Sequence, residues 1–304
     1  MELLKTLCGI PSVSGHEEPM HRFLLDYIQQ HHTKWNKQPE ILHGEDYQHC
    51  IVLVFGQPRT AVFAHIDSIG FHTRYGNALV RIGGPRTADG FILCGKDSLG
   101  EIEGELHVDE DDRQLSIRFH REIDRGTPLH FKMDFREDAD WVQSCYLDNR
   151  LGVYNALRLC ETLENGIVVF SCWEEHGGGS VPYLIKTLWD KYRIRQCLIS
   201  DITWVTEGVK AGHGVAVSLR DSGIPRRVFV DRVIRILEES GVPHQLEVEG
   251  SGGSDGNEIQ KQPYPIDWCF VGAPEDHVHS PDELVHKADI EAMLNAYRIL
   301  MEKL

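Results

Sequence analysis

The sequence predicts an α/β protein with a mostly parallel central sheet flanked by helices, into which a small β domain is inserted. After Asp148, apolar strand-like runs alternate with helix-like segments, and this alternation is typical of a parallel sheet. Between 68 and 144, short alternating segments are separated by Gly, Asp and Pro clusters, which favours a compact β unit. We therefore expect one domain built from 1–67 plus 145–304, interrupted by a β domain at 68–144.

The individual elements follow from hydrophobic periodicity. Apolar residues at helical spacing behind Ser14-Gly15 predict a helix at 16–31. Two apolar runs, 50–55 and 60–64, flank Gly56-Gln57-Pro58 and predict a strand-turn-strand pair. Farther along, we expect helices at 150–163, 178–190, 226–239 and 287–302, and strands at 166–173, 195–200, 244–248 and 266–272.

Composition excludes several classes of partner. The 304-residue chain has a formal net charge of -16 and no Lys/Arg-rich run, which argues against binding to nucleic acid. No apolar run approaches the roughly 20 residues that span a membrane, and the first residues lack the pattern of a signal peptide. The eight cysteines are scattered without a Cys-x-x-Cys pair, as in reduced cytoplasmic proteins. We expect a cytoplasmic protein whose partners are small molecules, peptides or metal cations.

Metal-binding residue types follow several of the predicted strands, where open α/β sheets bind ligands. A lone His or Asp in such a place is more often a cap or loop residue than a ligand. Two adjacent glutamates ending an apolar strand are harder to explain as a solvated strand end. His277 is an alternative to His279 as a ligand. The candidates, in chain order, are His65, Asp67, Asp148, Glu174, Glu175, Asp201 and His279.

Together these pieces resemble the cytoplasmic dinuclear metallopeptidases that include glutamyl aminopeptidase, deblocking aminopeptidase and proteins labelled endoglucanase M. The matching motifs occur in family order over nearly the whole chain. They are Ala64-His65-Ile66-Asp67-Ser68-Ile69-Gly70, Leu147-Asp148-Asn149-Arg150-Leu151-Gly152, Glu174-Glu175, Asp201-Ile202-Thr203, Gly252-Gly253-Ser254-Asp255 and His279-Ser280-Pro281.

The resemblance implies two divalent metal ions per chain, with zinc favoured and cobalt or manganese as alternatives. It implies that His65 and Asp201 hold one ion, that Glu175 and His279 hold the other, and that Asp148 bridges both. Glu174 would be the general base. Asp67 would accept the ring N–H of His65 and fix its tautomer.

The resemblance also implies an aminopeptidase that hydrolyses N-terminal residues from short peptides through a metal-activated water. It implies a homo-oligomer, from a dimer joined through the inserted β domain up to a dodecamer. Two departures from the family pattern concern specificity and assembly: the stretch 176–180 and the short loop 202–213. Arg150, Gly177 to Ser180 and Gly252 to Asp255 are candidates for selecting the first side chain. The alternatives are a related dinuclear amidohydrolase or deacylase acting on acylated amino acids, and a catalytically silent scaffold.

Overall fold

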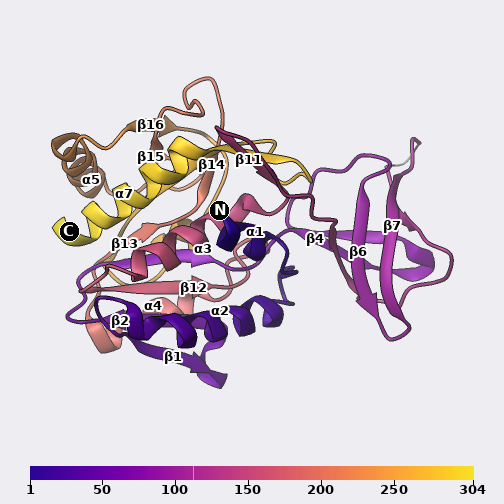
Figure 1. Cartoon of the computed structure of the whole chain (residues 1–304), viewed down its shortest axis with the longest axis horizontal. Helices are drawn as coiled ribbons and strands as arrows, with labels where there is room; N and C mark the ends of the chain where they lie inside the picture. The colour runs from indigo at the N-terminus through magenta and orange to yellow at the C-terminus, as the bar shows by residue number, and fades with distance from the viewer. Residues whose placement is uncertain (112) are drawn as a thin grey trace.

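A computed structural model describes residues 1–111 and 113–304 and contains two sheets. The larger has twelve strands and the smaller has six, and the small sheet lies at one end of the elongated molecule (Figure 1). The predicted α/β fold with a small inserted β domain is confirmed. None of the helices in the described ranges has the length and apolar character needed to cross a membrane. The eight cysteines are free thiols, and all but Cys94 are buried.

Four parallel strands form the centre of the large sheet, in the order β12 (Gly166–Ser171), β3 (Ala61–His65), β13 (Gln196–Ile199) and β17 (Asp267–Asp276). Pairing becomes antiparallel on both sides of this centre. β12 pairs with β2 (Gln48–Phe55), and β2 with β1 (Glu40–Gly44). β17 pairs with β18 (Glu283–His286), which is followed by β11 (Trp141–Ser144) and β10 (Arg136–Glu137). The remaining strands, β14 (Ile202–Trp204), β15 (Val215–Arg220) and β16 (His244–Val248), extend the sheet from β17.

The strands predicted at 50–55 and 60–64 form as β2 and β3, but the predicted pairing between them is wrong. β12 lies between them, antiparallel to β2 and parallel to β3. All six residues of β12 are buried, as expected of a strand covered on both faces. A short Gly/Pro connection indicates that the chain turns, but it does not decide whether a later strand enters the gap.

Five helices lie within a few residues of their predicted positions, and their apolar sides are buried: α2 (Glu18–His31), α3 (Leu147–Cys160), α4 (Val181–Tyr192), α5 (Arg227–Ser240) and α7 (Lys287–Lys303). Two short helices were not predicted, α1 (Glu2–Cys8) and α6 (Asp255–Gln260). A capping box between Ser254 and Asn257 begins α6. Three 3-10 turns complete the helical elements, η1 (His32–Lys34), η2 (Glu45–Tyr47) and η3 (Tyr75–Asn77).

The small sheet is antiparallel and has its own core. Its strand order is β5 (Leu79–Ile82), β4 (Gly70–Thr73), β9 (Pro128–Phe131), β6 (Ile92–Asp97), β7 (Gly100–Val108) and β8 (Leu115–Arg118). A bridge between Ala78 and Ser116 brings the two ends together, so the sheet is barrel-like. Its core includes Phe71, Leu93 and Phe131. β10 and β11, inside the range 68–144, pair with the large sheet instead.

Candidate metal centre

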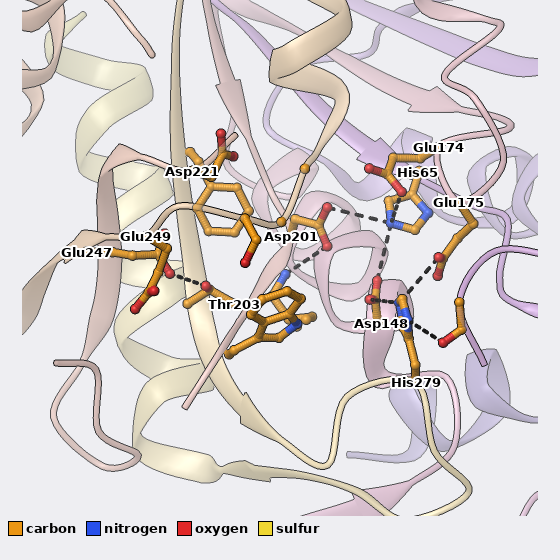
Figure 2. Close-up of a pocket in the computed structure, with 17 residues that line it drawn as sticks. His65, Asp148, Glu174, Glu175, Asp201, Thr203, Asp221, Glu247, Glu249 and His279 are labelled. Atoms are coloured by element: carbon orange, nitrogen blue, oxygen red, sulfur yellow. Dashed lines mark hydrogen bonds and ion pairs between the residues drawn. The ribbon is translucent and has the colours of Figure 1, made fainter. Parts of the chain in front are cut away.

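Six of the seven predicted site residues line one cavity of about 300 Å³ at the carboxyl edge of the central strands (Figure 2). The six are His65, Asp148, Glu174, Glu175, Asp201 and His279. Because β3, β12 and β13 are parallel, the residues that end or follow them meet at one edge of the sheet. His279 enters from the connection between β17 and β18, and Asp148 from the first turn of α3.

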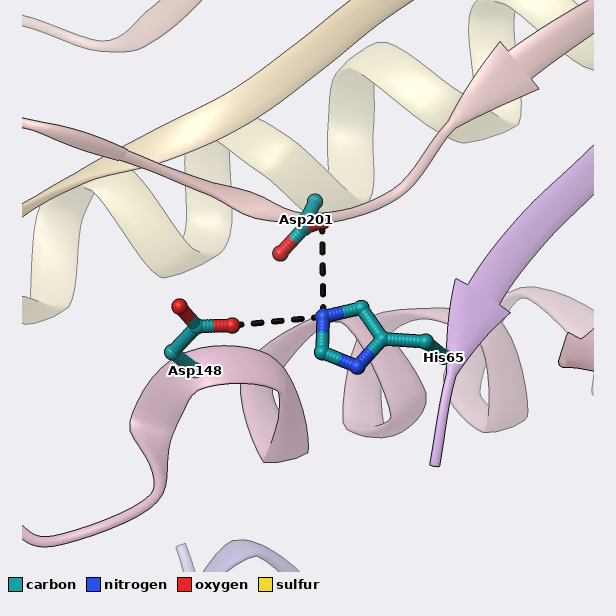
Figure 3. Close-up of side chains that lie close together, drawn as sticks. All are labelled: His65, Asp148 and Asp201. Atoms are coloured by element: carbon teal, nitrogen blue, oxygen red, sulfur yellow. Dashed lines mark ion pairs between the residues drawn. The ribbon is translucent and has the colours of Figure 1, made fainter. Parts of the chain in front are cut away.

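The first group of possible ligands contains His65, Asp148 and Asp201. His65 Nε2 lies 3.3 Å from Asp148 Oδ1 and 3.6 Å from Asp201 Oδ2, as Figure 3 shows. All three residues are buried. One imidazole and two carboxylates converging on a common point form a donor set that suits a divalent cation.

The second group contains Asp148, Glu175 and His279. His279 Nε2 lies 3.2 Å from Asp148 Oδ2 and 3.3 Å from Glu175 Oε2. The two carboxylate oxygens of Asp148 therefore face different imidazoles, Oδ1 toward His65 and Oδ2 toward His279. That arrangement lets one carboxylate serve two neighbouring cations.

The electrostatics of both groups indicate that the site needs positive charge. Burial and the charge of the neighbouring Asp148 together raise the pKa of Glu175 to about 7, against the opposing influence of His279 and His65. Burial alone would lower the pKa of His279, but hydrogen bonds to Asp148 and Glu175 hold it well above its usual value. Glu175 Oε1 is buried without a hydrogen-bond partner among the described residues. Divalent cations would supply the missing charge and the missing partner, so the residues fit a dinuclear centre.

Glu174 lies beside the first group without belonging to either. Its Oε2 is 3.9 Å from His65 Nε2. Burial raises the pKa of Glu174 well above its usual value, and the charges of Glu175 and Asp201 add to that effect despite the opposing influence of His65. A carboxyl group with a raised pKa at the edge of a metal site can accept and release a proton near neutral pH.

Asp67 does not line the cavity but lies fully buried behind it. Its Oδ1 is 3.4 Å from His65 Nδ1 and accepts the backbone N–H of Glu174 at 3.1 Å. Its Oδ2 accepts the backbone N–H of Glu175 at 3.2 Å and the hydroxyl of Ser14 at 2.6 Å. A single carboxylate thus holds the end of β3 and the residues after β12 in position. The sequence predicted only its contact with His65.

Arg150 does not have the substrate contact suggested from the sequence. Its side chain is fully buried, and the guanidinium donates to the carbonyl of Ile66 at 2.8 Å and to that of Ile10 at 3.4 Å. It therefore fixes the chain after β3. His277 is in neither group of possible ligands, and its side chain is 53% exposed beside Asp276. Gly252 and Gly253, in contrast, line the cavity as suggested.

Sequence reasoning missed Glu283, a buried carboxylate on β18. Its Oε1 accepts the backbone N–H of His279 at 2.9 Å, and its Oε2 accepts that of Asp148 at 3.3 Å. Glu283 therefore orients two members of the second group. Its position four residues after His279 was the only feature of the sequence that linked Glu283 to the site.

The far wall of the cavity was also missed. It carries Thr203, Asp221, Glu247 and Glu249 (Figure 2), and Trp204 and Phe270 also line the cavity. Asp221 directly follows β15, so the rule that selected Asp201 after β13 could have found it. β15 itself was not predicted, and the rule was therefore not applied there.

Comparisons with known proteins agree with this geometry. The chain is 26% identical to an Acetivibrio thermocellus protein named "Putative aminopeptidase", over 99% of this chain and 97% of that protein. An aminopeptidase from the archaeon Desulfurococcus kamchatkensis has the same fold, with a TM-score of 0.87 and 19% identity, covering 100% of this chain and 94% of that one. The TET1 peptidase of Pyrococcus horikoshii matches with a TM-score of 0.83 and 22% identity, covering 100% and 99%.

The model of one peptidase family, M42 glutamyl aminopeptidase, matches residues 105–295. This range is more than half of the chain and includes five of the seven predicted site residues, from Asp148 to His279. The chain therefore belongs to the M42 glutamyl aminopeptidase family of peptidases.

Proposed function

We propose that the protein is a dinuclear metal-dependent aminopeptidase that removes N-terminal residues from short peptides. The observation that carries the proposal is the position of Asp148, whose two carboxylate oxygens face His65 and His279 at 3.3 and 3.2 Å. A shared carboxylate reduces the repulsion between two closely spaced cations. Family membership and the aminopeptidase neighbours support the same activity.

In this proposal His65 and Asp201 hold one divalent ion, Glu175 and His279 hold the other, and Asp148 contacts both. Mixed imidazole and carboxylate donors favour zinc and also accept cobalt or manganese. Two such ions would polarise the scissile carbonyl and make a bound water easier to deprotonate.

The chain's own residues transfer the proton and orient the substrate. Glu174 takes a proton during attack on the carbonyl and returns it to the departing amine, for which its raised pKa is suited. Asp67 keeps the backbone of Glu174 fixed through the hydrogen bond at 3.1 Å. The carboxylates around the cavity orient the positively charged α-ammonium of the substrate. The glycines at 252 and 253 keep the wall beside the scissile bond free of side chains.

The decisive experiment compares matched peptides with free and acetylated N-termini, using purified metal-loaded protein. We expect release of the first residue from the free peptide alone. The Glu174→Gln variant, purified in parallel, controls for contaminating peptidases. Equal rates on the two peptides, or cleavage of internal bonds, would exclude an aminopeptidase. Turnover of acylated amino acids alone would instead identify a deacylase with the same metal centre.

We further propose that the chain forms a homo-oligomer in the cytoplasm. One structural neighbour is a dodecamer, and another assembles into a tetrahedron or an octahedral shell. In this chain the small sheet exposes Val80 and Leu99, and the adjoining turn exposes Tyr75. Apolar side chains of this kind are suited to contacts between copies. Light scattering tests the proposal, because a mass of 34.6 kDa at working concentration would show a monomer.

A further inference from the structure

The wall of the cavity opposite the candidate metal centre is acidic. Asp221 follows β15, Glu247 lies on β16 and Glu249 follows that strand. Figure 2 shows these three side chains together on the side of the cavity away from His65 and His279. Of the described residues, no Lys or Arg lines the cavity. The two ions proposed above would be balanced by the ligands and Glu174, so the carboxylates of the far wall have no counter-charge in the cavity.

Two of these carboxylates are more than nine-tenths buried, and one of them, Asp221, has an oxygen without a hydrogen-bond partner among the described residues. Glu247 is 4% exposed, and its Oε1 accepts the hydroxyl of Thr203. Asp221 is 7% exposed, and its Oδ1 accepts the backbone N–H of Gly223 and the side-chain amide of Asn257. The side chain of Ser218 also interacts with the Glu247 carboxylate, whereas Oδ2 of Asp221 remains available. A buried carboxylate that keeps an open oxygen toward a cavity needs a donor from the ligand.

The nearest basic side chain does not supply that donor to Asp221. Arg220, next to Asp221, directs its Nε to the backbone carbonyl of Asp221 and does not line the cavity. Burial raises the pKa of Glu247 and of Asp221, and this effect outweighs the hydrogen bonds to both groups and the charge of Arg220 near Asp221. A cation entering this end of the cavity would gain hydrogen bonds and charge at the same time.

Two aromatic side chains lie in the lining of the same cavity. Phe270 and Trp204 line it, and Trp204 is 41% exposed at the rim. Gly252 adopts a φ of +89°, which favours glycine, and lies beside Trp204: a Cβ there would be 3.8 Å from the indole, an ordinary contact distance. An aliphatic stem can lie along these rings while its charged end reaches the carboxylates.

We propose that this end of the cavity selects substrates whose N-terminal residue has a long cationic side chain, lysine or arginine. The inference rests on the proposed aminopeptidase function and adds the substrate class. The scissile bond lies at the metal centre, the methylene stem lies along Phe270 and Trp204, and the cation binds Asp221, Glu247 and Glu249. A substrate glutamate would place a carboxylate against three others, so the family's description does not set the preference of this chain.

The test uses the p-nitroanilides of lysine, arginine, norleucine and glutamate with purified metal-loaded enzyme. Norleucine has nearly the shape of lysine without the ammonium, so the pair isolates the effect of charge. We expect kcat/KM for lysine to exceed that for norleucine at least tenfold, with glutamate slowest. A kcat/KM for norleucine equal to or above that for lysine, or the highest kcat/KM for glutamate, would overturn the inference. Either result would leave the aminopeptidase proposal intact. No turnover of any of the four would overturn both.

Variants distinguish a direct contact from a structural role. Glu247→Gln and Asp221→Asn should each lower the lysine-to-norleucine ratio of kcat/KM at least tenfold. Glu249→Lys, at the half-buried rim, should raise the rate on glutamate relative to lysine. Glu239→Gln, on the exposed side of α5, should leave the ratio unchanged. Equal losses on lysine and norleucine in all three cavity variants would contradict the assignment.

The salt dependence of the lysine preference is an independent test. Added ions weaken the proposed charge contact more than they weaken the packing of the methylene stem. The preference for lysine over norleucine should therefore shrink as ionic strength rises. A preference that does not change with salt would contradict the ionic contact.

Discussion

Oδ1 of Asp67 accepts a hydrogen bond from the backbone N–H of Glu174 at 3.1 Å. Through this bond, a residue outside the cavity determines where the proposed general base lies. The same carboxylate approaches His65 Nδ1 at 3.4 Å, so the candidate metal ligand on β3 and the proposed base after β12 share one support. The geometry of the centre therefore depends on side chains behind the ligands.

Replacing Asp67 by Asn should weaken metal binding and catalysis together. The variant keeps the shape of the side chain but turns one acceptor into a donor that faces other donors. Changes at such supporting residues typically reduce metal affinity or activity about 10–100-fold. Metal titration by calorimetry and kcat measurement check this. Ser14→Ala, which removes only a hydroxyl donor to Asp67, should have a smaller effect. Wild-type affinity and turnover in Asp67→Asn would show that the support is dispensable.

Replacing Asp148 by Ala should empty both metal positions, because this carboxylate faces both imidazoles. Asp201→Ala should mainly reduce one position, since Asp201 belongs to the first group alone. Elemental analysis after gel filtration measures the number of ions per chain. Asp26→Ala, on the exposed side of α2, is the matched control. Two ions per chain in Asp148→Ala would refute the bridging role.

Replacing Glu174 by Gln should separate catalysis from metal binding. The amide keeps the size of the side chain but cannot accept the proton, so kcat should fall by about 10²–10⁴-fold. Metal content should stay at the wild-type level, because Glu174 is in neither group of possible ligands. Loss of an ion from this variant would mean that Glu174 is itself a ligand.

The small β domain should lose stability in acid through Asp97. A side-chain hydrogen bond from Arg121 lowers the pKa of Asp97, and backbone N–H groups of Asp124 and Leu99 add to the effect. Because the folded pKa is below the unfolded value of about 3.9, the stabilisation is present above about pH 4 and is lost as pH falls through the folded pKa.

Urea unfolding of the wild type and of Asp97→Asn, measured across pH, tests this expectation. The wild type should have the larger free energy of unfolding near neutral pH. The difference in this free energy between the two proteins should shrink as acid protonates Asp97. Asp26→Asn serves as the control for a general effect of lost charge. A difference that persists unchanged at the lowest pH would contradict the role of ionisation.

The sequence predicted those parts of the fold that depend on local periodicity. The helices at α2, α3, α4, α5 and α7 have continuous apolar stripes, and β2, β3, β12, β13, β16 and β17 have apolar or alternating runs. The pairing of strands was harder to predict from the sequence, because the insertion of β12 between β2 and β3 depends on contacts between residues distant in sequence. β15 was missed although most of its residues are buried.

The candidate ligands were found because they follow strands and match recognisable motifs, and the structure brings them together. The supporting and substrate-side residues lack such a signal. Glu283 acts through backbone hydrogen bonds that no motif indicates. Arg150 was a candidate for selecting the first side chain of the substrate, whereas the chain buries it to hold backbone carbonyls. The roles of the ligands and of Glu174 stay predictions until the variants above are measured.

The centre draws its groups from five separate segments, beginning at His65 and ending at His279. A ribosome adds about 5–20 residues per second, so on the order of ten seconds or more separates the appearance of these two histidines during translation. Throughout that interval the nascent chain lacks the second imidazole facing Asp148. The proposed centre is therefore complete only near the end of synthesis, and any fragment that ends before His279 lacks one of its candidate ligands.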